Sequence, residues 1–203
     1  AKEHVAAGFR VIKTKVGTNI ADDIARVKAI REAVGDDVKI RLDANQGWHA
    51  REAVELLKRL NEYDIELVEQ PVRRFDFEGL KYVTANSPVP VMADESCWDS
   101  KDALRLVSER AVDFINIKLM KCTGMREAWK MVTLARALGM KVMVGCMTET
   151  SCAISAAAQF SPAVDFADLD GSLLIANDRF KGMEVVKGKI TLPDLPGIGV
   201  VKI

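Results

Sequence analysis

Short apolar runs rich in Val and Ile alternate with longer segments of helical period along most of the chain. This alternation is typical of repeated strand-helix units that build a parallel sheet. Seven strands are predicted, and all but the last lead into a helical segment. Their expected ranges are Arg10–Val16, Val38–Ala44, Ile65–Gln70, Val89–Asp94, Phe114–Leu119, Lys141–Cys146 and Val164–Asp168.

The helical segments between these strands carry apolar stripes and end signals. Asp99 or Ser100 can cap the helix after the fourth strand, and Trp129 falls in the stripe of the next helix, which predicts packing rather than chemistry. Gly35 is a stop signal for the first long helix. We expect the apolar stripe of that helix to face the core. It consists of Ile20, Ile24, Val27, Ile30 and Val34.

The order of the segments predicts the fold. Eight parallel strands closing into a barrel is the common solution for a strand-helix repeat. The chain opens with a helical fragment at 1–8 rather than with a strand. We therefore predict an α/β chain, a TIM-like (β/α)₈ barrel that lacks its first strand, with a doubly wound open sheet as the alternative.

The repeat ends after the seventh strand. Residues 1–178 are expected to form the barrel portion, with strands two to eight, and residues 179–203 a C-terminal segment. Glycine and proline punctuate that segment. Two short strands are predicted in it, Met183–Val186 and Lys189–Leu192.

Composition narrows the function. With 203 residues, 49% of them hydrophobic, the chain can bury one substantial core. The 29 basic and 29 acidic residues cancel, so neither nucleic acid nor a membrane surface is an expected partner. The four cysteines form no C-x-x-C pair and no signal peptide is apparent, which favours a reducing cytoplasm. Histidine occurs twice, so the chemistry is expected to use lysines and carboxylates.

Polar residues recur at the carboxyl ends of the predicted strands, where barrel enzymes place their active groups. Asp43, Glu69, Asp94 and Lys118 are separated by 26, 25 and 24 residues, one strand-helix unit each time. One such residue alone more often forms a surface ion pair or a helix cap. The ordered series favours a functional site. Its members are Lys13 and Lys15, Asp43 and Asn45, Glu69, Asp94, Lys118, and Asp168 and Asp170.

Three of these residues predict a metal site. Asp43, Glu69 and Asp94 lie on adjacent strands, and their charges would repel one another without a cation. Three hard oxygen ligands without cysteine or histidine favour Mg²⁺, and Mn²⁺ could substitute.

Two lysines predict proton transfer. If the first strand present is barrel strand two, Lys15 and Lys118 lie on strands two and six, on opposite sides of an eight-strand ring. A carbon acid between two amines can lose a proton to one and regain a proton from the other, which inverts its configuration. The metal would stabilise the enediolate between these steps. Lys13, two residues from Lys15 on the same strand face, adds a like charge that favours neutral Lys15.

The last strand ends in Asp168 and Asp170, which could bind a cationic substrate group such as an ammonium. A helix cap or a turn is the competing interpretation, because Gly-Ser follows. Met147 is a candidate pocket residue after the sixth predicted strand, although apolar residues on barrel strands are more often core. Asn45 and Met147 complete the predicted substrate contacts.

The chain from Phe9 to Val200 resembles the muconate-lactonizing subgroup of the enolase superfamily. That resemblance implies Asp43, Glu69 and Asp94 as metal ligands, Lys15 and Lys118 as the acid/base pair, and Lys13 in support of Lys15. The stretches that carry it are IKTKVG (12–17), RLDANQGW (41–48), VEQP (68–71), MADES (92–96) and NIKLMK (116–121).

Within the subgroup, GCMTET (145–150) followed by DLDG (168–171) is similar to the dipeptide epimerases of the L-Ala-D/L-Glu epimerase type. This implies Mg²⁺-dependent epimerisation of dipeptides through an enediolate, with Asp168 and Asp170 on the substrate ammonium. The family's amino-terminal capping domain has no counterpart in this sequence, and residues 179–203 would pack with such a domain. Members of the subgroup often form homo-oligomers.

Other functions remain open from the sequence. The same lysines and metal would serve an N-succinylamino acid racemase, an o-succinylbenzoate synthase or a muconate cycloisomerase. The aspartate pair argues against substrates that lack a cation. A non-enzymatic alternative is an inactive metal-binding barrel fragment.

Overall fold

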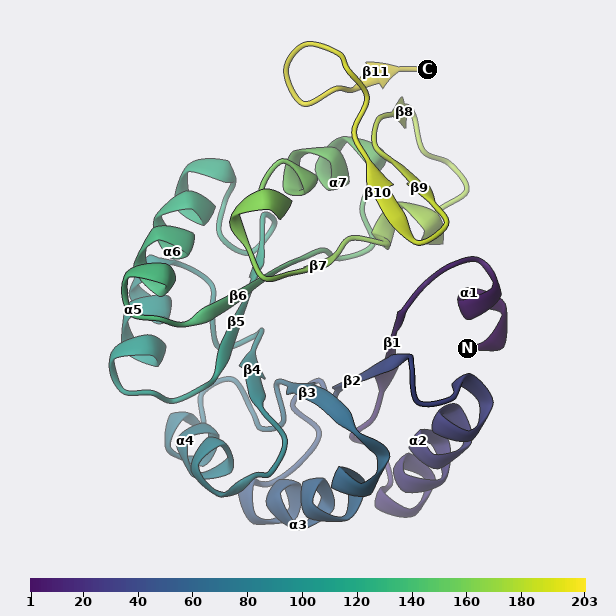
Figure 1. Cartoon of the computed structure of the whole chain (residues 1–203). Coiled ribbons are helices and arrows are strands. Elements are labelled where there is room, and N and C mark those ends of the chain that lie inside the picture. The colour runs from purple at the N-terminus through teal and green to yellow at the C-terminus, as the bar shows by residue number, and fades with distance from the viewer. The chain divides into compact units, whose positions relative to one another are not determined.

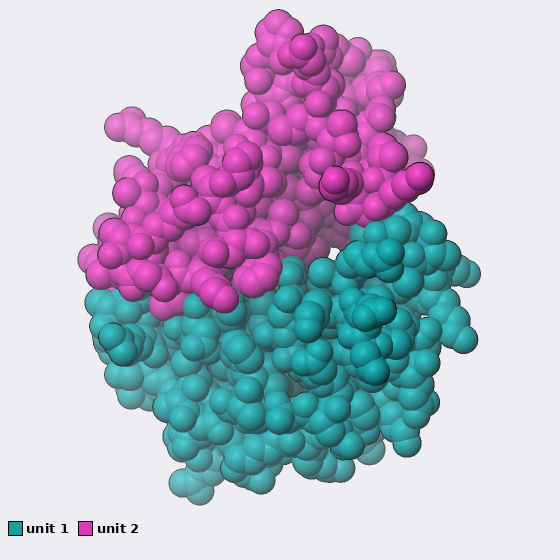
Figure 2. Space-filling view, in the orientation of Figure 1, with its two compact units in different colours: residues 1–96, 106–114 teal, residues 97–105, 115–203 magenta.

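A computed structural model describes residues 1–203 (Figure 1). The chain divides into two compact units (Figure 2). Unit 1 contains residues 1–96 and 106–114, and unit 2 contains residues 97–105 and 115–203. No helix is both long enough and apolar enough to cross a membrane.

Unit 1 alternates helices with four parallel strands in the order β1-β2-β3-β4. The helices α2, α3 and α4 lie along the outer side of these strands (Figure 1). Buried leucines on α3 and α4 supply part of the core. The elements are α1 (Lys2–Ala6), β1 (Val11–Lys15), α2 (Ile20–Val34), β2 (Lys39–Asp43), α3 (Ala50–Leu60), the 3₁₀ turn η1 (Asn61–Tyr63), β3 (Ile65–Glu69), α4 (Phe77–Asn86) and β4 (Val91–Ala93).

Unit 2 continues the alternation and adds a C-terminal segment of short strands. Two of the boundaries between the units fall within helix α5 (Ser100–Ser108) and within strand β5 (Phe114–Lys118). Strands β6 and β7 pair in parallel, whereas β9 with β10 and β8 with β11 pair antiparallel. The remaining elements are α6 (Met125–Ala137), β6 (Lys141–Gly145), α7 (Ser151–Ala158), η2 (Ser161–Ala163), β7 (Phe166–Asp168), η3 (Gly171–Leu174), β8 (Phe180–Lys181), β9 (Glu184–Val186), β10 (Lys189–Thr191) and β11 (Val201–Lys202).

The seven predicted strands are all present and are somewhat shorter than predicted. The prediction included flanking residues such as Val16, Ala44 and Asp94, which are buried but lie beyond the strand ladders. Within the parallel strands of each unit, strands adjacent in the chain are adjacent in the sheet. A doubly wound sheet would reverse its strand order at a switch point, and neither unit does so. The two predicted strands of the C-terminal segment are β9 and β10, while β8 and β11, of two residues each, were not predicted.

The predicted buried face of α2 is wrong in part. The helix has the expected bounds, and Gly35 ends it with φ 73°. Its buried residues are Asp23, Val27 and Arg31, spaced four apart, and the other residues of the apolar stripe are only half-buried. Buried polar side chains must be hydrogen-bonded, and both Asp23 and Arg31 are.

Asp23 and Arg31 connect α2 to neighbouring main chain. The Asp23 carboxylate accepts the Gly17 N–H at 2.8 Å. The Arg31 guanidinium donates to the carbonyls of Val38 at 2.7 Å and Tyr63 at 3.0 Å. Two hydrogen-bonded polar side chains are thus buried on α2, where the sequence pattern predicted buried isoleucines.

Two smaller predictions concern α5 and α6. Asp99 caps α5, because its carboxylate accepts the N–H groups of Lys101 at 2.8 Å and Asp102 at 3.0 Å. Trp129 packs as predicted, with its ring centroid 4.9 Å from that of Phe160, although 46% of its surface stays exposed.

Strand register brings the polar strand ends of unit 1 into one row. Lys15 pairs with Asp43, and Asp43 pairs with Glu69 across β1, β2 and β3. Residues paired in this way point to the same side of the sheet. In β1, Ile12 and Thr14 are buried on the opposite face. The fold therefore collects lysines and carboxylates on one side of the strand ends.

The loops after β1 and β2 touch through two glycines. Gly17 has φ 101°, a conformation that L side chains rarely adopt. A Cβ on Gly47 would lie 2.6 Å from Gly17 Cα and would collide with the Gly17 carbonyl oxygen. Only glycine fits at both positions, and this close approach sets the spacing of the two loops that follow Lys15 and Asp43.

Gly47→Ala should therefore lower the free energy of unfolding of the full-length protein by about 1–3 kcal/mol through overpacking against backbone. Denaturant unfolding measures the change. Ala29→Ser, at an exposed position of α2, is the matched control and should stay within about 0.5 kcal/mol of the wild type. Equal stability of Gly47→Ala and the control would show that the two loops can separate without cost.

Candidate active site

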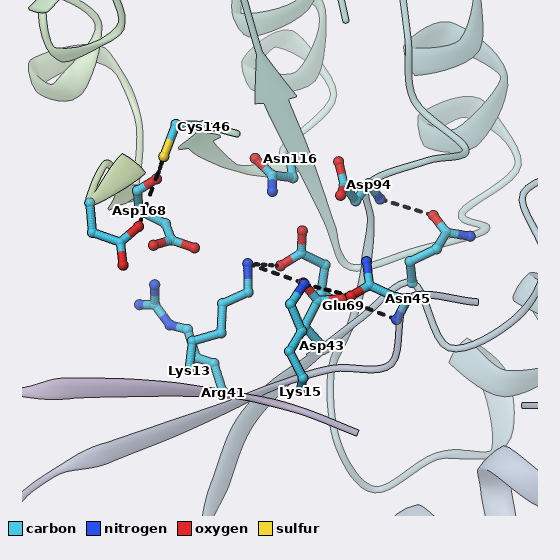
Figure 3. Close-up of polar contacts among 12 residues, drawn as sticks. Lys13, Lys15, Arg41, Asp43, Asn45, Glu69, Asp94, Asn116, Cys146 and Asp168 are labelled. Carbon is cyan, nitrogen blue, oxygen red and sulfur yellow. Dashed lines mark hydrogen bonds and ion pairs between the residues drawn. The ribbon is translucent and has the colours of Figure 1, made fainter. Parts of the chain in front are cut away.

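Two buried carboxylates in unit 1 share one ammonium group. Lys13 Nζ lies 3.2 Å from Asp43 Oδ2 and 2.8 Å from Glu69 Oε2 (Figure 3). The Asp43 and Glu69 side chains are 1% and 0% exposed. Burying an unpaired carboxylate is costly, so the bridging ammonium stabilises both. Lys13 therefore bridges two predicted metal ligands, and its predicted support of Lys15 stays a prediction.

Lys15 lies beside the same pair. Its Nζ donates to Asp43 Oδ2 at 2.7 Å and to Asn45 Oδ1 at 2.5 Å (Figure 3). Its side chain remains 67% exposed, in contrast to the carboxylate that it contacts. Lys15 therefore has a fixed ammonium position and an open side that a substrate can reach.

The third carboxylate, Asp94, follows β4 and is 3% exposed. Gln70 holds the main chain there, because its Oε1 accepts the N–H groups of Asp94 and Ser96, both at 3.0 Å. Its Nε2 donates to Ser96 Oγ at 2.8 Å and to the Val72 carbonyl at 2.9 Å. Gln70 itself is fully buried, with φ 40°. One amide thus fixes the turn that presents Asp94.

An amide and carboxylate network adjoins Lys15. Asn45 Nδ2 and Gln46 Nε2 both donate to Glu95 Oε1 at 3.2 Å. Gln46 Oε1 accepts the Arg74 N–H at 2.9 Å. Asn45 was predicted to bind substrate; that role stays a prediction, and the amide contacts Lys15 and Glu95.

The donor set of Asp43, Glu69 and Asp94 suits a hard divalent cation. All three are carboxylates, they end consecutive strands, and each is at most 3% exposed. As the side chains stand, no three Asp, Glu, His or Cys groups converge closely enough to hold a metal ion, and Lys13 bridges two of the acids. Charge and chemistry therefore fit Mg²⁺, because the single ammonium of Lys13 offsets only part of the negative charge of the acids that it bridges.

In unit 2, Lys118 is the last residue of β5 and is 9% exposed. The turn after it is closed by the N–H groups of Lys121 and Cys122, which donate to the Lys118 carbonyl at 3.0 and 3.1 Å. Lys121 is also buried, and its Nζ donates to the Asn116 carbonyl at 3.0 Å. The main chain of the predicted second base is thus rigidly held.

The predicted ammonium site also lies in unit 2. Asp168 ends β7 and pairs in register with Gly145, the last residue of β6. Asp170 is exposed just before η3. Met147 is 42% exposed, so it is not a core residue, and its pocket role stays a prediction. Binding of an ammonium by Asp168 and Asp170 stays a prediction as well.

Cys146 joins the ends of β6 and β7. Its Sγ lies 3.2 Å from the Asp168 carbonyl oxygen and 4.0 Å from Asp170 Oδ1 (Figure 3). Burial raises the pKa of the Cys146 thiol from 9.0 to about 12, and the charges of Asp168, Asp170 and Glu149 add to the rise. The thiol therefore stays protonated at neutral pH and can donate to the Asp168 carbonyl.

Sequence reasoning missed three side chains of these networks: Gln70, Glu95 and Gln46. All three lie inside stretches that carry the family resemblance, RLDANQGW, VEQP and MADES, but none of them ends a predicted strand as a charged group. A signal was present for two of them, since Gln70 and Glu95 each directly follow a predicted metal ligand. Their hydrogen-bond partners become visible only in three dimensions.

The chain is similar to known proteins in sequence and in fold. A family model described as enolase C-terminal domain-like matches residues 1–201. The chain is 58% identical over 205 residues to L-Ala-D/L-Glu epimerase of Bacteroides thetaiotaomicron, covering 100% of this chain and 52% of that protein. The chain thus spans about half the length of this curated relative.

Solved structures are similar over the same length. The crystal structure of dipeptide epimerase from Enterococcus faecalis, complexed with Mg and the dipeptide L-Leu-L-Tyr, is 49% identical with a TM-score of 0.93, covering 98% of this chain and 58% of that one. The N-succinyl Arg/Lys racemase from Bacillus cereus is 32% identical with a TM-score of 0.95, covering 100% of this chain and 56% of that one. These similarities confirm the predicted fold class, an α/β barrel domain.

The raised pKa of Cys146 predicts low reactivity. A rise from 9.0 to about 12 lowers the thiolate fraction near pH 8 roughly 1,000-fold. Peptide mapping by mass spectrometry after iodoacetamide treatment should show Cys146 alkylated far more slowly than glutathione in the same tube, and Asp170→Asn should speed the reaction. Alkylation of Cys146 at the glutathione rate would contradict the described environment.

Proposed function

Because the chain belongs to the enolase C-terminal domain-like family, we propose that the protein is an isomerase that epimerises dipeptides at the carbon alpha to the carboxylate. The reaction is a Mg²⁺-dependent 1,1-proton transfer. The observation that carries the proposal is the row of Lys15, Asp43 and Glu69, with Lys13 between the acids. Acidic ligands beside an accessible lysine are what removal of a proton alpha to a carboxylate requires.

Lys15 is the proposed base on one face of the alpha carbon, and Lys118 the proposed acid/base group on the other. Proton removal at Nζ of one lysine leaves an enediolate, and proton delivery from Nζ of the other gives the opposite configuration. A lysine that accepts a proton must be neutral. Lys13 and Lys15 both contact Asp43 Oδ2, which places the proposed base beside a second lysine.

Asp43, Glu69 and Asp94 would hold Mg²⁺. When bound, the ion would neutralise charge that develops on the substrate carboxylate. The chain's own contribution is to keep three carboxylates buried, with Gln70 fixing the turn at Asp94. Main-chain fixation of this kind avoids reorganisation during the reaction.

Asp168 and Asp170 would bind the terminal ammonium of the dipeptide. Two carboxylates near one cationic group favour its charged form and orient the substrate. Cys146 supports this role because its thiol contacts the Asp168 carbonyl at 3.2 Å. A dipeptide thus offers a carboxylate, an alpha proton and an ammonium to three sets of residues.

A second candidate is racemisation of N-succinylated amino acids. The similarity to the N-succinyl Arg/Lys racemase favours it as the alternative, since the acids and lysines would serve both reactions. The two substrates differ in the group that Asp168 and Asp170 would meet. A free ammonium would be attracted there, whereas a succinyl carboxylate would be repelled.

Proton NMR in D₂O with Mg²⁺ tests the proposal on the full-length protein. L,L-dipeptides and N-succinylamino acids are incubated in parallel, and loss of the alpha-proton signal and appearance of the epimer are followed. Exchange with inversion in dipeptides supports the proposal. Exchange confined to N-succinylated substrates would replace it by the racemase, and exchange in neither would contradict both.

Substituting each lysine in turn should show which lysine acts on which face of the substrate's alpha carbon. Lys15→Ala and Lys118→Ala should each reduce epimerisation by at least about 100-fold while sparing the fold, because inversion needs both groups. Each variant should still exchange the alpha proton of one epimer, and the two should retain opposite epimers. Lys28→Ala, at an exposed position of α2, is the control for the loss of a lysine. Full activity of both variants, or retention of the same epimer, would rule out the two-base mechanism.

Removing a proposed metal ligand should weaken Mg²⁺ binding. Asp43→Asn, Glu69→Gln and Asp94→Asn keep side-chain size and remove one charge each. We expect the affinity for Mg²⁺ to fall by more than the roughly 10–100-fold that is typical when a residue that only orients a metal ligand is lost. Isothermal titration calorimetry with MgCl₂ measures it, with Glu78→Gln on the exposed side of α4 as the control. Unchanged affinity in all three variants would exclude these ligands.

A further inference from the structure

Lys15 has a long, flexible side chain, yet two side-chain hydrogen bonds converge on its Nζ. Asp43 Oδ2 lies 2.7 Å away and Asn45 Oδ1 2.5 Å away. A lysine ammonium is a point charge with rotatable donors and does not orient itself. Two fixed acceptors restrict where Nζ lies and which directions remain open. The amide of Asn45 is the acceptor that the proposed metal site does not use.

The orientation of the Asn45 amide is set by its two neighbours. Its oxygen accepts from Lys15, and its nitrogen donates to Glu95 Oε1 at 3.2 Å. An asparagine amide has one accepting and one donating end, so a carboxylate on one side and an ammonium on the other select a single orientation. Glu95 thereby determines that an oxygen, and not an NH₂ group, faces Lys15.

Glu95 is itself fixed from several directions. Gln46 Nε2 donates to the same Oε1 at 3.2 Å. Gln70 Oε1 accepts the N–H groups of the residues on either side of Glu95, Asp94 and Ser96. A network in which each member is hydrogen-bonded acts as a rigid unit.

The backbone at Asn45 and Gln46 adds a second observation. Both residues have positive φ, 41° and 68°, a conformation that costs energy in residues other than glycine. In this conformation both side chains donate to Glu95, and the Asn45 N–H also donates to Asp43 Oδ1 at 3.1 Å. Such strain persists where surrounding contacts over-determine the conformation.

We propose that Glu95 is a positioning residue for Lys15, acting through the Asn45 amide, so that it serves proton transfer on one face of the substrate. This inference rests on the proposed two-base function. Glu95 needs no contact with the substrate. Its effect is to hold Lys15 Nζ in one position, which fixes the path along which the proton is transferred.

The test measures exchange of each epimer separately in D₂O with the full-length protein and Mg²⁺. The epimer that depends on Lys15 is the one whose exchange is lost in Lys15→Ala. Glu95→Ala should slow exchange of that epimer by roughly 10–100-fold, as a misplacement of about 1 Å can. Exchange of the other epimer should stay within about 2-fold of the wild type. Equal slowing of both epimers would overturn the proposal, because a merely structural role affects both faces.

Two further variants identify the path. Glu95→Gln keeps an oxygen that can accept from Asn45 and Gln46, so it should recover most of the lost rate, and it serves if Glu95→Ala does not fold. Asn45→Ala should show the same one-sided loss, and the double variant Glu95→Ala/Asn45→Ala should lose no more than either single one. Additive losses would mean that Glu95 does not act through Asn45. Glu55→Ala, at an exposed position of α3, is the control.

A structural readout separates failure of this inference from failure of the proposed function. Crystal structures of the wild type and Glu95→Ala should show Lys15 Nζ leaving Asn45 in the variant. This holds even if the wild type exchanges no tested substrate, which would refute the proposed function alone. Lys15 Nζ unmoved between Asp43 and Asn45 in the variant would overturn the positioning role.

Discussion

The site depends on acidic side chains buried at the ends of β2, β3 and β4. Asp43, Glu69 and Asp94 are 1%, 0% and 3% exposed, and a buried charge without compensation costs several kcal/mol. Positive charge must therefore be present near them. Lys13 bridges two of the acids and Lys15 adds a second ammonium to Asp43. The need to balance these charges brings the proposed base, its neighbour and the proposed metal ligands into one cluster.

Amide side chains fix the main chain around this cluster. Gln70 holds the turn at Asp94, and Asn45 and Gln46 reach from the loop after β2 to Glu95. These three amide residues adopt positive φ, so local strain and hydrogen bonding occur at the same positions. The charged side chains are the groups that are proposed to react or to bind metal, and the neutral amides hold the main chain around them. The position of the proposed reactive nitrogen, Lys15 Nζ, therefore depends on the loops as well as on the strand ends.

The strands and the charged strand ends could be predicted because their signals are local. Period, length and a constant spacing of one strand-helix unit place Asp43, Glu69 and Asp94 without knowledge of any contact. The buried face of α2 could not be predicted, because Asp23 and Arg31 are buried only where main-chain partners meet them. Glu95 and Gln70 were missed for the same reason. Strands β8 and β11, of two residues each, are too short to produce a pattern.

The most direct test of the proposed mechanism is a crystal structure of the full-length protein with Mg²⁺ and a dipeptide. We expect one metal ion on Asp43, Glu69 and Asp94, with the substrate carboxylate as a further ligand. We also expect Nζ of Lys15 and Nζ of Lys118 on opposite faces of the alpha carbon, each within about 3–3.5 Å. A metal bound elsewhere, or both lysines on one face, would contradict it.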